Sequence, residues 1–170
     1  MDRMVSLSSR KKLSFKQEDA WNTPPHVWED IAHLIPKNKI IWEAFMKDNW
    51  GSTSIKTLQG MGLSVVGNPT IDFFLGENFD YDMIISNPPY SCKLKIFEKL
   101  AIIDKPFILL LPVSVITKQF IKVLDRNSLQ LVIPKARIHF IKDGEQTKRS
   151  WFDVVYLCYK LQLPNDITYL

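Results

Sequence analysis

The chain has 170 residues, of which 46% are hydrophobic and 24% are charged, and its net charge is +4. This composition is typical of a soluble globular protein, and the length allows one domain with a real core but not two ordinary ones. No apolar run approaches the roughly 18 residues of a membrane-spanning helix, and no apolar segment follows the first basic residues as in a secretory signal. We therefore expect an intracellular protein, in the cytoplasm or the nucleus, that does not bind membranes.

The cysteines and the basic residues bear on the class of partner. Cys92 and Cys158 have neither the spacing of a metal site nor that of a disulfide framework, so we expect no bound metal. The mild positive charge permits binding to nucleic acid without requiring it. Lysines and arginines gather within residues 10–12, 93–99 and 142–149. Each group taken alone is typical of a solvated surface, and only a catalytic motif pointing the same way would favour an acidic polymer as partner.

The first part of the chain divides into a tail and the start of a domain. Residues 1–20 are polar and lack periodicity, which predicts a flexible tail, and we interpret residues 21–170 as one domain. A Thr-Pro-Pro sequence at 23–25 interrupts the chain. Apolar residues then recur at helical spacing, which predicts a helix over residues 26–35, stopped by the proline that follows.

Strands and helices alternate through the rest of the chain. Helices are predicted at about 52–60, 92–103 and 115–124. Strands are predicted at 39–45, 63–66, 81–86, 107–111, 129–133 and 152–161, the last two flanking a polar loop at 142–150. Alternation at this spacing indicates an α/β fold with a doubly wound, mostly parallel sheet, and the closing strand–loop–strand indicates an antiparallel hairpin at one edge.

The most informative motif is Asn87-Pro88-Pro89-Tyr90, which directly follows the strand predicted at 81–86. Loops that leave the carboxyl ends of central strands are where open α/β sheets bind ligands. The two prolines fix φ and restrict Asn87 to extended geometry, so the loop is rigid. The alternative is a proline-stiffened turn with Tyr90 in the core.

The residue types of this motif suit an –NH₂ substrate. The Asn87 side-chain oxygen and the Pro88 carbonyl can each accept one amino hydrogen, which aims the nitrogen lone pair at an incoming methyl group. Such positioning can supply several kcal/mol of the barrier to an in-line displacement. Tyr90 offers a flat face for a base taken out of its stack.

With this motif the chain resembles the amino-methyltransferases of the Rossmann-like, S-adenosylmethionine-dependent class, whose fourth motif is Asp/Asn/Ser-Pro-Pro-aromatic. The resemblance covers roughly residues 19–160. Residues 19–25 are similar to the opening of phage-type DNA adenine methyltransferases, which lies against the cofactor. Residues 41–45 are similar to the first motif, and residues 71–74 to the segment that holds the adenine of the cofactor. This order of motifs is that of the gamma-type group.

The resemblance implies a cofactor and a set of site residues. The cofactor is S-adenosyl-L-methionine, and the catalytic residues are Asn87, Pro88, Pro89 and Tyr90. The residues implied in cofactor binding are Thr23, Pro24, Glu43, Phe45, Asp72, Phe73 and Asn87. The chain departs from the family where glycines normally continue the first motif, since Lys47 and Asn49 stand there, and Gly67-Asn68-Pro69 replaces the acidic residue expected after the second strand.

The expected substrate is the exocyclic N6 amino group of adenine, with DNA favoured over RNA. Lys93, Lys148 and Arg149 are the candidates for phosphate contacts, and Trp151 is the candidate for stacking beside the target base. The alternative for residues 142–151 is an exposed polar turn of an edge hairpin. The motif alone also permits an RNA adenine methyltransferase or a protein glutamine methyltransferase. A catalytically silent, methyltransferase-like subunit that binds nucleic acid is the alternative from another class.

Overall fold

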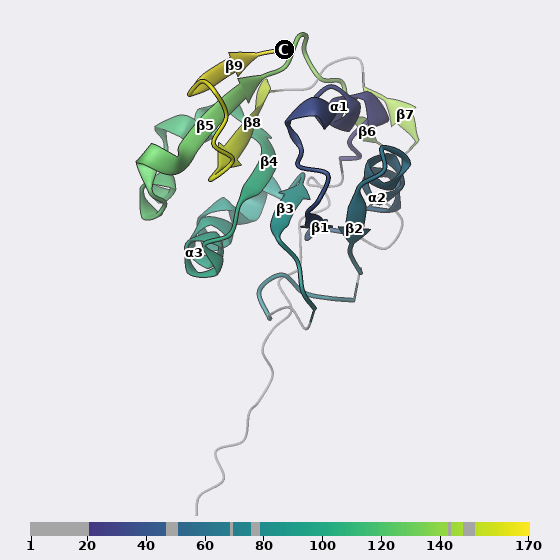
Figure 1. The fold of residues 1–170 in the computed structure, drawn as a ribbon. Helices are drawn as coiled ribbons and strands as arrows, with labels where there is room; N and C mark the ends of the chain where they lie inside the picture. Colours follow the sequence, from purple (N-terminus) through teal and green to yellow (C-terminus); the bar gives the residue numbers. More distant parts are fainter. Residues whose placement is uncertain (1–20, 47–50, 69, 76–78, 143, 148–151) are drawn as a thin grey trace, which may run out of the picture.

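The computed structural model describes residues 21–46, 51–68, 70–75, 79–142, 144–147 and 152–170, and the fold is given for these (Figure 1). The main sheet has seven strands in the order β2-β1-β3-β4-β8-β5-β9. Its strands are β1 (Ile40–Trp42), β2 (Ser64–Val66), β3 (Met83–Ser86), β4 (Phe107–Pro112), β5 (Leu129–Ile133), β8 (Val154–Tyr159) and β9 (Ile167–Tyr169). A separate antiparallel hairpin pairs β6 (Ile141–Lys142) with β7 (Glu145–Gln146).

The sheet is mostly parallel, as the sequence predicts. Strands β2, β1, β3 and β4 run parallel to one another, whereas β8 is antiparallel to both β4 and β5. The predicted antiparallel pairing of 129–133 with 152–161 is therefore present as β5 with β8. This pair does not form the outermost edge, because β9, which sequence patterning missed, adds to β5 in parallel.

Helices cover both faces of the sheet, so its central strands are buried on both sides. The α-helices are α1 (Pro25–Glu29), α2 (Gly51–Gly60) and α3 (Lys93–Ile103), and Figure 1 places α3 on the other side of the strands from α1 and α2. In β3, Met83 and Ile85 join the core that includes Trp28 of α1, whereas Ile84 joins the core that includes Phe97 of α3. This alternation produces three layers.

Two predicted helices differ from the structure. The helix predicted over 26–35 is α1 followed by a 3₁₀ turn, η2 (Ala32–Leu34), because Ile31 leaves helical geometry at ψ 6° to bury its side chain completely. The helix predicted at 115–124 is wrong. Two 3₁₀ turns stand there, η4 (Val113–Thr117) and η5 (Gln119–Val123), separated by an extended Lys118. Residues 113–117 are rich in β-branched side chains, which lowers their helix propensity.

Further 3₁₀ turns flank other elements, η3 (Tyr90–Cys92) before α3 and η6 (Arg126–Ser128) before β5. The polar loop predicted at 142–150 contains the β6–β7 turn, in which Gly144 takes a positive φ of 85°. Within the described part of the chain, no helix is both long enough and apolar enough to span a membrane.

Buried hydrogen bonds fix the start of the domain. The Trp28 indole N–H of α1 donates to the Ser54 hydroxyl of α2 at 3.0 Å, and the Tyr156 hydroxyl of β8 donates to the Val27 carbonyl at 2.6 Å. Tyr156 is completely buried, and burial raises the pKa of its hydroxyl. These contacts hold α1 against the sheet and so fix the segment that precedes it.

The chain reverses its direction of winding at β1. From β1 it continues through α2 to β2 on one side, and it then returns to form β3 on the other side of β1. In open α/β sheets the carboxyl ends of strands at such a switch point form the crevice in which ligands bind. The residues that follow β1 and β3 are Glu43 and Asn87.

Candidate active site

The carboxyl ends of β1 and β3 are joined by a buried contact. The hydroxyl of Ser86, the last residue of β3, donates to Oε1 of Glu43, and the backbone N–H of Phe45 donates to the same oxygen at 3.3 Å. Glu43 is only 4% exposed. The sequence placed Glu43 and Phe45 at the cofactor and missed Ser86, whose only signal was its position before the Asn-Pro-Pro-Tyr motif.

Burial changes the proton affinity of Glu43. Loss of water around the carboxyl raises its pKa to about 7, and the hydrogen bonds from Ser86 and from the Phe45 backbone oppose this rise. A carboxyl group with such a pKa changes charge near neutral pH. Strongly shifted groups in a crevice are characteristic of functional sites, although structural networks also produce them.

Asn87 lies at the same edge and is tied to the segment before α1. Its side-chain N–H₂ donates to the Thr23 hydroxyl at 3.1 Å, and Thr23 is buried. The Asn87 Oδ1 is buried and has no hydrogen-bond partner among the described residues. A buried acceptor without a donor costs about 1–3 kcal/mol, so an unsatisfied one requires an explanation. An incoming amino group is a donor that would satisfy it.

The rest of the motif forms a rigid wall. Pro88 and Pro89 are buried, and Pro89 has the extended geometry (φ −64°, ψ 125°) that directs the chain into η3. The Tyr90 ring meets the Phe152 ring edge-on, with centroids 5.1 Å apart. Trp21, Asn87, Pro88 and Tyr90 line a hollow of about 10 Å³, which we call the Asn87 hollow.

The residues implied in holding the adenine of the cofactor are partly covered. Phe73 is only 2% exposed, and its ring packs on Phe45 and Trp42 with centroids 4.6 and 5.6 Å apart. Asp72 Oδ1 accepts the backbone N–H of Phe74 at 2.8 Å, which closes a local turn. Pro24 is buried at the start of α1, beside Thr23. The structure therefore groups Phe45 and Phe73 and holds the Phe45 N–H against Glu43.

Gly67, which the sequence analysis treated only as a departure from the family, lies close to the end of β1. A Cβ at this position would lie 2.7 Å from Ile55 Cδ1, 2.8 Å from Met46 Sδ and 3.1 Å from the Glu43 carbonyl oxygen. The backbone after β2 thus lies too close to the end of β1 to leave room for a side chain at position 67.

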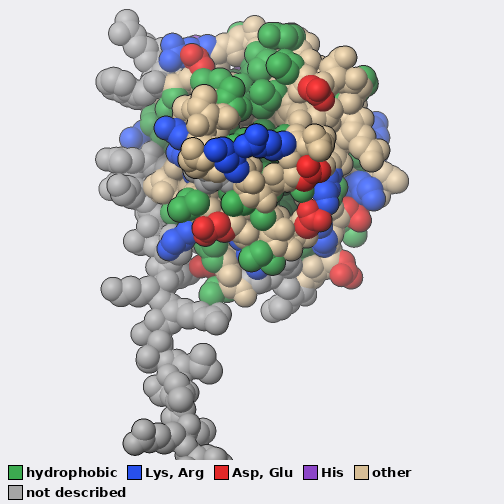
Figure 2. All heavy atoms as spheres, turned by 90° about the vertical axis from the view of Figure 1, so that its left-hand side faces the viewer, with side chains coloured by type: hydrophobic (Ala, Val, Ile, Leu, Met, Phe, Trp, Pro, Cys, Tyr) green, Lys and Arg blue, Asp and Glu red, His purple; other side chains and the backbone are tan. Residues whose placement is uncertain are grey.

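Of the three residues proposed to contact phosphate, the structure describes only Lys93. Lys93 donates to the Tyr90 carbonyl at 2.6 Å, and its ammonium lies 5.7 Å from the Tyr90 ring centroid. Lys148, Arg149 and Trp151 lie outside the described residues. On the face shown in Figure 2, several basic side chains adjoin across the upper middle, and acidic and hydrophobic side chains lie around them.

Comparisons with known proteins support the fold. No protein-family model matches the chain, and no curated protein matches its sequence. A putative class I S-adenosylmethionine-dependent methyltransferase from Listeria monocytogenes is similar in structure, with a TM-score of 0.55 and 13% identity over 93% of this chain and 67% of that one. An S-adenosylmethionine-dependent O-methyltransferase from Thermotoga maritima gives a TM-score of 0.51 and 11% identity over 88% of this chain and 70% of that one. At these identities the likeness shows a shared Rossmann-like α/β fold.

Proposed function

We propose that this chain is an S-adenosylmethionine-dependent methyltransferase that acts on the N6 amino group of adenine, in DNA in preference to RNA. The observation that carries the proposal is the Asn87 Oδ1, a buried acceptor without a donor at the topological switch point of a fold shared with methyltransferases. An aromatic ring and a proline carbonyl stand next to it in the Asn87-Pro88-Pro89-Tyr90 loop. This set suits a planar molecule with an exocyclic –NH₂ group.

The residues at the end of β1 suit the cationic part of the cofactor. S-adenosylmethionine supplies a methyl group on a positively charged sulfonium. The Glu43 carboxyl, held by Ser86 and the Phe45 N–H, is an acidic group at the carboxyl edge whose ionised form a nearby cation would favour. Asp72 and Phe73 are the residues proposed to border the adenine of the cofactor, and the Phe73 ring packs on that of Phe45.

The chain's own residues account for the chemistry at the amino nitrogen. Asn87 Oδ1 and the Pro88 carbonyl accept the two amino hydrogens. The nitrogen lone pair then points toward the methyl group. The Thr23 hydroxyl accepts from the Asn87 N–H₂, which fixes the amide so that its oxygen faces the substrate. Because the two prolines restrict the backbone, the loop keeps this geometry without further ordering of its backbone when substrate binds. The nitrogen loses its extra proton after the methyl group has transferred, so no strong base is needed.

The test offers several amino substrates in parallel. Purified protein with cofactor carrying a labelled methyl group is incubated with duplex DNA, single-stranded DNA, structured RNA and a glutamine-rich protein. We expect label in DNA, as N6-methyladenine after digestion to nucleosides. Label only in RNA would move the substrate to RNA, and label only in protein would overturn the nucleic-acid assignment. An Asn87→Ala sample controls for contaminating methyltransferases.

A catalytically silent subunit that binds nucleic acid is the second candidate. The covered ring of Phe73, together with Lys47 and Asn49 at the usual glycine positions, favours it. Calorimetric titration with S-adenosylmethionine and with its demethylated product separates the two candidates. Binding of either ligand supports the enzyme, whereas heat from neither at millimolar ligand, together with no label transfer, supports the silent subunit.

A further inference from the structure

The Asn87 hollow is too small for the substrate that the proposed function requires. Its volume is about 10 Å³, which is room for about one water molecule. A purine, with nine ring atoms, needs far more space than one water molecule. Because Asn87, Pro88 and Tyr90 belong to the rigid motif, the fourth lining residue, Trp21, is the one that can make room.

The backbone that follows Trp21 is anchored. Asn22 exchanges two backbone hydrogen bonds with Ile141 of β6, of 2.8 and 2.9 Å. Thr23 accepts from Asn87, as described above. The Trp21 side chain can therefore rotate while the residues that follow it stay in place.

Among the described residues, the Trp21 ring makes edge contacts with two other rings and lies near a cation. Its centroid lies 6.3 Å from that of Phe140 and 6.5 Å from that of Phe152, both edge-on, and Lys142 Nζ lies 5.1 Å from the indole centroid. Trp21 is half-buried, so one side of it faces solvent. Such contacts are each worth about 1 kcal/mol and can be exchanged for similar contacts elsewhere on the surface.

We infer that the Trp21 indole occupies the place of the target base, and that a base enters the site by displacing it. Indole and purine are both flat bicyclic rings of nine atoms, so one can take the place of the other beside Tyr90. The indole N–H does not donate to Asn87 Oδ1 in the structure, which leaves this acceptor for the amino group of a substrate. The inference rests on the proposed function for the identity of the base, and it makes Trp21 a positioning residue for the substrate.

The test removes the indole side chain and measures which small molecule binds in the space that it leaves. Trp21→Ala should open a cavity that binds free adenine, as engineered apolar cavities bind small flat molecules. The wild-type protein should not bind it. Adenine should bind at least about fivefold more tightly than purine, which lacks the amino group that Asn87 accepts. Trp21→Ala/Asn87→Ala should lose this preference while still binding purine.

Matched variants keep the test decisive. Phe152→Ala removes a ring from the same cluster that does not line the Asn87 hollow, so it should show no preference for adenine over purine. Trp21→Leu retains part of the packing on Phe140 and Phe152 and replaces Trp21→Ala if that variant does not unfold cooperatively. Binding is measured by calorimetry and by the shift in melting temperature, so no turnover is needed.

The outcomes separate this inference from the proposed function. Selective adenine binding by the Trp21 variants supports the inference even if the protein transfers no methyl group, in which case only the enzyme assignment fails. Equal binding of adenine and purine, or no binding by folded variants, overturns the inference even if wild-type protein methylates DNA.

Discussion

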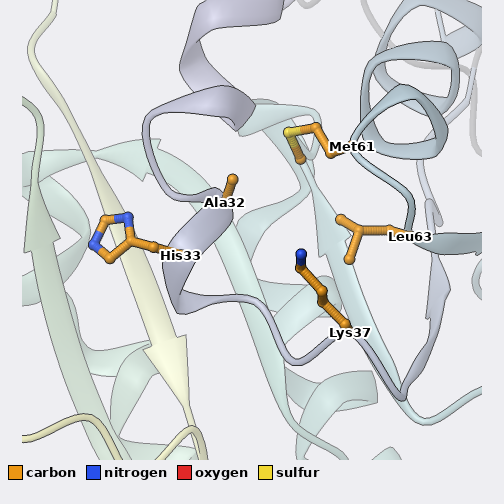
Figure 3. A pocket seen from close by; sticks show the side chains of 5 residues that line it. All are labelled: Ala32, His33, Lys37, Met61 and Leu63. Atoms are coloured by element: carbon orange, nitrogen blue, oxygen red, sulfur yellow. The ribbon is translucent and has the colours of Figure 1, made fainter.

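A cavity at the amino edge of the sheet and the Asn87 hollow at the carboxyl edge differ in size and in chemistry. The amino-edge cavity is lined by Ala32, His33, Lys37, Met61 and Leu63 and has a volume of about 180 Å³, against about 10 Å³ for the Asn87 hollow. In Figure 3, Lys37 reaches between η2 and the residues before β2, whereas the His33 ring points away. Lys37 and His33 are exposed, so their polar atoms are available to water.

The comparison shows that the candidate site is marked by the chemistry of its lining atoms and not by the volume of its cavity. The larger cavity lies where β1 and β2 begin, away from the switch-point crevice, and its charged and polar side chains are exposed. The smaller hollow contains a buried acceptor without a donor and lies at the edge where Glu43 titrates near pH 7. A buried unsatisfied group is costly and requires a reason, whereas a wet surface cavity does not.

The largest expected effect is on turnover. Asn87→Ala removes one of the two acceptors for the amino hydrogens, while Pro88 and Pro89 keep the loop in shape. We expect methyl transfer to fall by about 100- to 1,000-fold, the range for losing one preorganised hydrogen-bonding group in an active site. Lys37→Ala, in the amino-edge cavity, should leave the rate unchanged. Similar initial rates of the two variants with labelled cofactor would contradict the assignment of the active site to the Asn87 hollow.

The next effect is a pH dependence of stability due to Glu43. Its pKa is about 7 in the fold against the ordinary 4.5, so the folded state binds more protons than the unfolded state between these values. The free energy of unfolding therefore falls as pH rises from about 4.5 to about 7, and the full cost, about 3 kcal/mol, is present above pH 7.

Glu43→Gln should remove this dependence, since the amide oxygen still accepts from Ser86 and Phe45. The variant should be more stable than wild type at pH 8 and similar to it near pH 4.5, as measured by urea unfolding. Lys37→Ala should keep the wild-type profile. A wild-type stability that rises with pH across this window, with Glu43→Gln parallel to it, would contradict the assignment.

A smaller effect is expected on cofactor affinity. Asp72→Ala should weaken S-adenosylmethionine binding by about 1–3 kcal/mol, the range for losing a hydrogen bond to a charged group. Asp82 is the matched control, because it also accepts a backbone N–H, from Ile40 at 2.7 Å, but at the amino edge of the sheet. Asp82→Ala should therefore lower the melting temperature without changing the calorimetric affinity. Equal losses of affinity in both variants would reduce Asp72 to a structural role.

The positions of most strands along the chain and the position of the motif could be read from the sequence because both depend on local patterns. Apolar runs such as Phe107–Pro112 and the Pro-Pro pair after β3 are local signals. The prediction of a helix at 115–124 was wrong because it rested on apolar spacing. Spacing takes no account of the low helix propensity of the β-branched side chains in Val113–Thr117. β9 was missed because it has three residues and pairs with β5 only through the fold.

The candidate site was predictable in part for the same reason. Asn87 and Glu43 each follow a strand, so their meeting at one edge follows from parallel pairing. The Thr23–Asn87 hydrogen bond and the contact of Trp21 with the Asn87 hollow join residues more than 60 positions apart. No single-sequence pattern reports such a pairing. The sequence assigned the segment at 19–25 to the cofactor, whereas Trp21 lines the hollow beside Asn87.

The smallest expected effect is on the salt dependence of nucleic-acid binding. Each phosphate contact adds about 0.9 to the slope of log affinity against log salt concentration for duplex DNA. Lys93 lies at the carboxyl edge but already donates to the Tyr90 carbonyl at 2.6 Å, so Lys93→Ala should lower the slope by less than that amount. Lys148→Ala/Arg149→Ala should lower it by up to about twice that amount if both contact phosphate. Lys37→Ala, at the opposite edge, should leave the slope unchanged, which separates local contacts from the general effect of net charge. If all three variants change the slope in proportion to the charge removed, the nucleic acid is not held at the carboxyl edge, and the substrate assignment loses its support while the role of Asn87 is unaffected.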